Sequence, residues 1–68
     1  MMHSLLTKRE YEIFNLLVKN YSTKDISFSL GISEKTVRNH ISNVIQKLSV
    51  ESRIQAVLEL IRLKEIEL

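Results

Sequence analysis

The side chains best suited to chemistry cluster in residues 32–43, which read ISEKTVRNHISN. In a helix, Val37 and Ile41 fall on one side of this stretch, and polar groups fall on the other. Arginine can pair with two acceptors of guanine, asparagine can pair with adenine, and lysine, serine and threonine reach phosphates. The polar side and its flanks consist of Lys35, Arg38, Asn39, Ser42, Asn43 and Gln46. This face has the chemistry of a helix that reads a nucleic-acid groove.

Acidic residues are scarce around this face. Glu34 is the only acid between Asp25 and Glu51, and it stands in the first turn, where the helix dipole favours a carboxylate. A helix face that is merely solvated commonly carries Glu and Lys one turn apart. An ordinary exposed helix with few acids stays open as an alternative on this stripe alone. The glycine-containing turn before the stretch counts against that alternative.

The expected elements are all helices, because the chain has no proline and a single glycine and its apolar periodicity is helical throughout. We therefore expect an all-α, four-helix domain that spans residues 1–68. Its helices are expected at 8–19, 23–30, 34–48 and 53–63.

The start of the first helix is marked by Thr7 and Glu10, which have the spacing of a capping box. Leu6 and Tyr11 are placed as a hydrophobic staple around this box. The core face of the first helix is expected to consist of Tyr11, Ile13, Phe14, Leu17 and Val18.

The second and third helices are expected to be joined by a short turn. Ser22 can cap the second helix, Gly31 suits the left-handed residue after its end, and Ser33 suits the cap of the third helix. Two helices joined by a three- to four-residue turn with glycine are typical of a helix-turn-helix motif. The fourth helix begins at a second candidate capping box, Ser52 and Gln55.

Composition limits the remaining classes of function. The net charge is only +2, but residues 19–53 carry three more basic than acidic side chains, which suits a local positive face. Cysteine is absent, and His3 and His40 have no acidic partner at ligand spacing, so we expect no metal and no other cofactor. No catalytic arrangement or phosphate loop is evident, so we expect no enzyme activity. No apolar run is long enough to span a membrane, and we expect a cytoplasmic protein.

Three stretches together resemble the DNA-binding domain of the LuxR family of bacterial transcription regulators. They are LTKREYEIFNLLVKNYSTKDIS, LGISEKTVRNHISNVIQKL and SRIQAV, and the likeness covers about residues 5–62. The resemblance implies that the second and third helices form a DNA-binding helix-turn-helix and that the fourth helix dimerises. Among family members, the chain is most similar to a stand-alone sporulation regulator. The implied function is sequence-specific transcription regulation by a homodimer in the nucleoid, set by abundance if the chain is complete.

The resemblance also implies residue roles. It places Arg38, Asn39 and Ser42 at base edges. Ser42 stands where the family often has lysine or arginine, so direct readout is expected to rest mainly on Arg38 and Asn39. Ser27 stands where alanine is usual, which predicts looser or hydrogen-bonded packing of the second helix on the third. The phosphate backbone is expected at Thr23, Lys24, Lys35, Thr36, His40, Asn43 and Lys47.

The expected fourth helix is apolar on two sides. The family pattern directs Ala56, Val57 and Leu60 toward the core. A two-fold dimer through the other side would hold two recognition helices about 34 Å apart, which predicts inverted or paired half-sites in double-stranded DNA. Alternatively, the extra leucines cover other parts of the domain, including the tail 64–68. The side left for a second copy is Ile54, Leu58 and Ile61.

Phe28 falls on the outer side of the second helix, away from Ile26 and Leu30. Either it contacts RNA polymerase, or it lies flat against neighbouring lysine and serine side chains, and we expect the second. A rival to the DNA hypothesis is a small helical module that docks on the transcription machinery without reading DNA. That module would bind a protein without sensitivity to salt and would leave no footprint on DNA.

Overall fold

The computed structural model describes residues 5–68, and this part of the chain consists of four helices with no strand. Their bounds are α1 (Lys8–Leu17), α2 (Thr23–Leu30), α3 (Glu34–Leu48) and α4 (Arg53–Arg62). The predicted all-α architecture is therefore confirmed. The first helix ends at Leu17, two residues before the expected end, and the fourth ends at Arg62, one residue before it.

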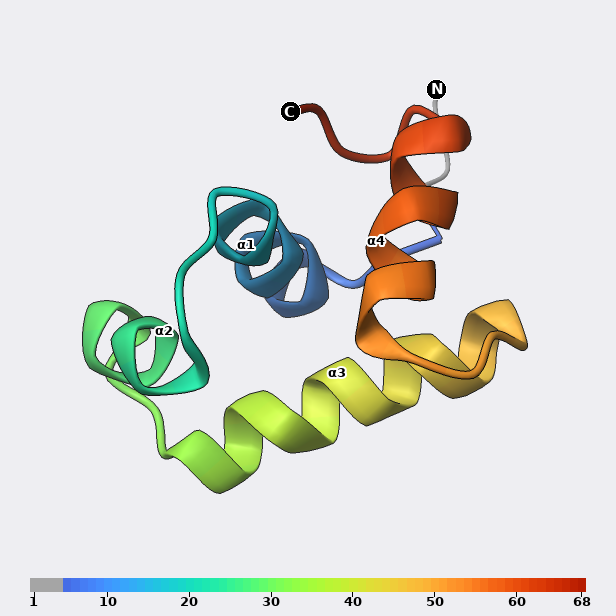
Figure 1. Ribbon diagram of the computed structural model, residues 1–68. Helices are drawn as coiled ribbons and strands as arrows, with labels where there is room; N and C mark the ends of the chain where they lie inside the picture. Colours follow the sequence, from blue (N-terminus) through green and yellow to red (C-terminus); the bar gives the residue numbers. More distant parts are fainter. Residues whose placement is uncertain (1–4) are drawn as a thin grey trace.

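The longest helix, α3, organises the domain, because it contacts each of the other three helices. Figure 1 shows α3 crossing below α1, α2 and α4. Val37, Ile41 and Val44 form its buried seam. The remaining buried apolar side chains come from all three other helices and from both flanking segments, namely Leu6, Ile13, Phe14, Ile26, Ala56, Leu60 and Ile66.

The capping box of α1 is present as predicted. The Glu10 amide donates to Thr7 Oγ1 at 3.1 Å, and the Thr7 amide donates to Glu10 Oε1 at 2.9 Å. The second predicted box is only half formed. The Gln55 amide donates to Ser52 Oγ at 3.2 Å, but Gln55 Oε1 accepts from the Glu51 amide instead of the Ser52 amide.

The inward face of α1 differs from the prediction at Tyr11, which is 45% exposed. Glu10 is buried in its place, at 4% exposure, together with Ile13 and Phe14. These three residues are spaced i, i+3 and i+4, which puts them on one helix face, whereas Tyr11 lies a quarter turn away. Of the two residues of the predicted staple, Leu6 is buried and Tyr11 is exposed.

The tail after α4 folds back on the domain. Lys64 adopts a left-handed backbone with φ of 63°, and the Glu65 amide donates to the carbonyl of Leu60 at 2.8 Å. This turn brings Ile66 into the core. Within residues 5–68, no helix is both long enough and apolar enough to cross a membrane.

Candidate nucleic-acid interface

The turn between α2 and α3 sets the angle of the helix-turn-helix. Gly31 closes α2 with a φ of 68°, and its amide donates to the carbonyl of Ser27. Ser33 then caps α3, because its Oγ accepts from the Thr36 amide at 3.0 Å and donates to Thr36 Oγ1 at 2.9 Å. Both turn residues therefore have the predicted roles, and no helix end in the motif lacks a cap.

The outward face of α3 carries the predicted base-reading residues. Arg38, Asn39 and Ser42 are all exposed, while Val37 and Ile41 between them are buried. Lys35 and Asn43 are also exposed on this helix, and Thr36 and His40 are half-buried. The structure thus brings most of the predicted contact residues together on one rigid helix that is fixed by its buried seam.

The amino-terminal end of α2 holds the two remaining predicted backbone residues. Lys24 is exposed, and Thr23 is half-buried. The guanidinium of Arg53 reaches across from α4, and its NH1 lies 3.5 Å from Thr23 Oγ1. Sequence reasoning did not find Arg53 as part of this region, because its side chain is brought to α2 only by the packing of the helices.

Lys47 has a different environment from the other predicted backbone residues. Its Nζ donates to Glu10 Oε1 at 2.7 Å and to the Leu5 carbonyl at 2.9 Å. Burial raises the pKa of Glu10, but hydrogen bonds from Lys47 and Thr7 and the lysine charge outweigh this effect, so the pKa is lowered overall. The Lys47 ammonium therefore joins α3 to α1, and its contact with DNA stays a prediction.

The hydroxyl of Ser27 is hydrogen-bonded but not to α3, so looser packing of α2 on α3 stays a prediction. The Ser27 Oγ donates to the Lys24 carbonyl at 2.8 Å, inside its own helix. The hydroxyl that replaces the usual alanine methyl is thus hydrogen-bonded without a partner on α3. Such a bond to the preceding turn is a common way for a helical serine to satisfy its donor.

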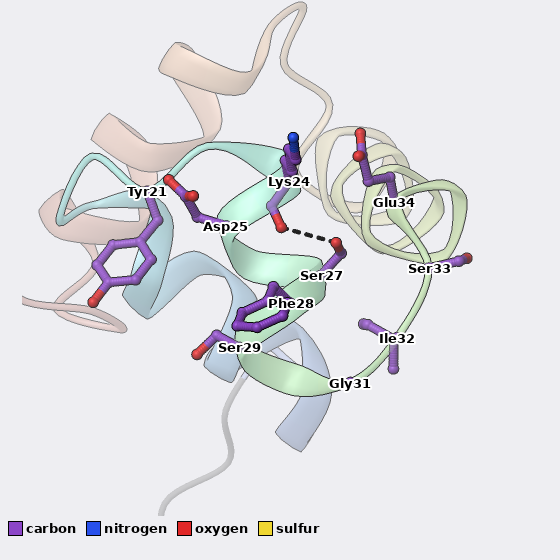
Figure 2. A pocket seen from close by; sticks show the side chains of 10 residues that line it. All are labelled: Tyr21, Lys24, Asp25, Ser27, Phe28, Ser29, Gly31, Ile32, Ser33 and Glu34. Atoms are coloured by element: carbon purple, nitrogen blue, oxygen red, sulfur yellow. Dashed lines mark hydrogen bonds between the residues drawn. The ribbon is translucent and has the colours of Figure 1, made fainter.

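Phe28 is the most conspicuous side chain beside the motif, because 91% of its surface is exposed. The prediction that it lies flat against its neighbours is wrong. Figure 2 shows its ring on the front of α2, with Tyr21 and Ile32 on either side of it. The adjacent Ser27 and Ser29 side chains are too short to cover an aromatic ring. Together these residues line a shallow surface depression.

The fourth helix has one buried side and one open side. Ala56 and Leu60 are fully buried, whereas Ile54 is 70% exposed and Leu58 is 61% exposed. Ile61 is half-buried next to them. The alternative in which the extra leucines of this helix cover other parts of the domain is wrong for Leu58, which stays largely exposed, whereas Leu60 is buried in the core. They line a second shallow depression with Leu17, Val18, Tyr21, Val57 and Leu68.

Among residues 5–68, no group of three or more His, Asp or Glu side chains could hold a metal ion. His3, for which no metal-binding role is expected, lies outside the described residues. The predicted contact residues are hydrogen-bonding and cationic side chains on helices, a set that suits contacts with bases and phosphates.

The geometry and the sequence agree with a known class of proteins. Residues 4–60 match the family model of bacterial regulatory proteins of the luxR family. The chain belongs to this family, and it is a transcription regulator with a LuxR-type helix-turn-helix DNA-binding domain.

A curated protein and a solved structure, both called GerE, match nearly the whole chain. The chain is 64% identical over 64 residues to spore germination protein GerE of Bacillus subtilis (strain 168), which covers 94% of this chain and 86% of that protein. The solved structure of transcription factor GerE matches with a TM-score of 0.93 and 71% identity, covering 96% of this chain and 97% of that one. The predicted likeness to a small member of the family is thereby confirmed.

Longer regulators carry the same domain. The chain is 50% identical over 58 residues to transcriptional regulatory protein DegU of Brevibacillus brevis, covering 85% of this chain but 25% of that protein. The response regulator ChrA of a heme-sensing two-component system matches with a TM-score of 0.85 and 30% identity. That match covers 97% of this chain and 33% of ChrA. The chain therefore spans a quarter to a third of these two relatives.

Proposed function

We propose that the protein binds specific sites in double-stranded DNA by laying α3 in the major groove. The observation that carries this proposal is the exposed row of Arg38, Asn39 and Ser42 on a helix whose opposite side is buried. Arg38 and Asn39 can each form two hydrogen bonds to one base, whereas the short hydroxyl of Ser42 can form fewer. Direct readout therefore rests mainly on the first two residues.

Phosphate contacts on both sides of the groove would fix the position of α3. The α2 end offers Thr23 and Lys24, with Arg53 beside them. Lys47 keeps its proposed phosphate contact and also has a structural role, because its ammonium contacts Glu10 and Leu5. The backbone contacts on α3 itself are proposed for Lys35, Thr36, His40 and Asn43.

A homodimer through α4 would present two copies of α3 to one DNA site. The support is the open apolar side of α4, where Ile54 and Leu58 are largely exposed and where a monomer would leave apolar surface in water. A two-fold arrangement would require two inverted half-sites about one helical turn apart. No cofactor and no catalytic step enters this mechanism.

In the cell, we propose a role in spore development, carried out on the nucleoid in the cytoplasm. Its support is the 64% identity with spore germination protein GerE, which extends over 94% of the chain. The stretch SEKTVRNHIS, which contains all of the proposed base-reading residues, lies within residues 4–60, which match the family model.

The test of DNA binding is selection from a pool of random duplexes. The proposal predicts enrichment of one motif that occurs in two copies related by a two-fold axis. Recovery of no motif, combined with protein binding that is insensitive to salt, would favour the helical interaction module instead. Footprinting on the enriched duplex then shows whether both copies are occupied together.

A second partner is favoured by Phe28. We propose that this ring and the depression around it contact RNA polymerase when the protein is bound to a promoter. An aromatic ring with 91% of its surface in water is typical of a contact residue rather than a packing residue. A Phe28→Ser variant should keep its DNA footprint and lose transcription activation in a purified system, whereas unchanged activation would remove this partner.

A further inference from the structure

Glu34 and Arg38 lie one turn apart on α3, just after the turn of the motif. The Oε1 atom of Glu34 is 3.5 Å from NH1 of Arg38, and both side chains are about half exposed. Glu34 is the sole acid in α3. A surface that only attracts phosphates would not carry a carboxylate, because its charge opposes the approach of DNA.

We propose that Glu34 is a positioning residue that orients Arg38 toward one base pair and thereby sets specificity. This proposal rests on the base-reading role of Arg38 in the proposed function. A guanidinium presents five N–H donors in one rigid plane. Glu34 engages the NH1 side, which leaves the edge formed by Nε and NH2 free for the two acceptors of a guanine.

The backbone around this pair is well suited to hold an orientation. Val37, which directly precedes Arg38, is fully buried, so the helix cannot turn about its axis without unpacking the core. Ser33 caps the helix with its own side chain, so the Glu34 carboxylate is free to contact arginine. The positive end of the helix dipole also favours a carboxylate at this position.

Prior orientation has an energetic consequence for DNA binding. A long arginine side chain loses rotamer freedom when it forms a base contact, and this loss opposes binding. A carboxylate one turn away restricts the side chain before DNA arrives. Its charge also weakens attraction to every duplex alike, so the gain in preference comes from the restricted arginine side chain. Removing Glu34 should therefore reduce preference while leaving non-specific affinity unchanged or higher.

The test compares base preferences from in vitro selection for the wild type and for Arg38→Ala, Glu34→Ala and Glu34→Gln. Glu34→Ala should lower preference about twofold, at the same base pair that Arg38→Ala relaxes. Glu34→Gln keeps an oxygen acceptor and should retain part of that preference. The double variant of Glu34→Ala with Arg38→Ala should show no loss of preference beyond that of Arg38→Ala.

Glu51→Ala is the matched control. It removes an exposed acid from the loop before α4 and should keep the wild-type preference.

The possible failures are distinguishable. If Arg38→Ala relaxes one base pair and Glu34→Ala changes none, the positioning role is overturned and base reading by Arg38 stands. If Glu34→Ala relaxes a different base pair, the role is also overturned, because the carboxylate then contacts a base itself, as a cytosine amino group would allow. If Arg38→Ala relaxes no base pair, both this proposal and the base-reading role fail. Circular dichroism should show the same helix content for all variants.

Discussion

The carboxylate of Glu10 and the ammonium of Lys47 lie 2.7 Å apart and join the first turn of α1 to the last turn of α3. The same ammonium holds the Leu5 carbonyl at 2.9 Å. The Glu10 carboxylate also accepts from the Thr7 amide, so one buried acid connects a helix cap, a second helix and the segment that enters the domain. This junction fixes the end of the helix that carries the proposed DNA contacts.

Replacing Lys47 with methionine should destabilise the domain, because it leaves the buried Glu10 carboxylate without its cation. Removing one partner of a fully buried pair costs roughly 3 to 5 kcal/mol. Lys47 is partly exposed, so we expect a smaller loss of about 2 kcal/mol in the free energy of unfolding. Urea denaturation followed by circular dichroism measures it. Lys35→Met, at an exposed position on the same helix, is the control and should change stability little.

The stability of the domain should fall in acid partly through Glu10. Its pKa in the folded state is lowered from the ordinary value of 4.5, so the folded state binds its proton less readily than the unfolded chain. The stabilisation is then complete above pH 4.5 and is lost as the pH falls through the lowered pKa. Urea unfolding at a series of pH values between 7 and 3 should show a steeper acid loss for the wild type than for Glu10→Gln. Parallel curves for the two proteins would contradict this role.

Two residues that end helices in the left-handed region should respond to substitution in opposite directions. Ser49 closes α3 with a φ of 58°, a conformation that costs an ordinary residue roughly 1 to 2 kcal/mol relative to glycine. Ser49→Gly should therefore raise the free energy of unfolding by up to about 1 kcal/mol. Gly31→Ala should lower it by about 1 kcal/mol through backbone strain alone, because no atom beyond the adjoining residues lies within 4 Å of the added methyl group. Thermal unfolding of both variants measures these changes in stability. A Gly31→Ala variant more stable than the wild type would contradict the role of backbone strain at Gly31.

Local signals in the sequence predicted the helices and their caps well, because these depend on a few neighbouring residues. Thr7, Ser22, Gly31 and Ser33 all cap as expected. The errors concern contacts between distant parts of the chain. Glu10 replaces Tyr11 in the interior because Lys47, 37 residues later, provides a cation there, and no pattern within α1 contains that information.

In the proposed site too, local features could be predicted from the sequence, and contacts between distant parts of the chain could not. The outward face of α3 follows from helical periodicity, since the apolar seam determines which residues point to solvent. The place of Arg53 beside Thr23 and the exposure of Phe28 depend on how helices pack and on how far neighbouring side chains reach. Glu34 and Arg38 have the i, i+4 spacing of an ion pair in the sequence, but spacing alone does not show that the two side chains meet.

Two kinds of DNA contact should be separable by their salt and sequence dependence. Arg38→Ala should relax preference at one position in each half-site and cost about 1 to 3 kcal/mol on the preferred sequence. Lys24→Ala should weaken all duplexes about equally and reduce the salt slope by about one, as expected for the loss of one phosphate contact. Titrations of specific and random duplexes at several salt concentrations measure both effects. Equal losses on both duplexes for Arg38→Ala would contradict its base-reading role.

A charge on the open side of α4 should separate the two copies of the proposed dimer. Leu58→Glu places a carboxylate where the second copy would bury an apolar side chain, and an unpaired charge in such an interface is strongly unfavourable. Because Leu58 is 61% exposed in the single domain, the variant should keep its fold and lose association. Tyr11→Glu, on an exposed part of α1, is the matched control and should leave the dimer intact. Sedimentation of the wild type and both variants measures the oligomeric state. DNA titration should show that Leu58→Glu occupies the two half-sites independently, because each recognition helix then binds without its partner. A dimer of unchanged stability in Leu58→Glu would show that another surface joins the copies.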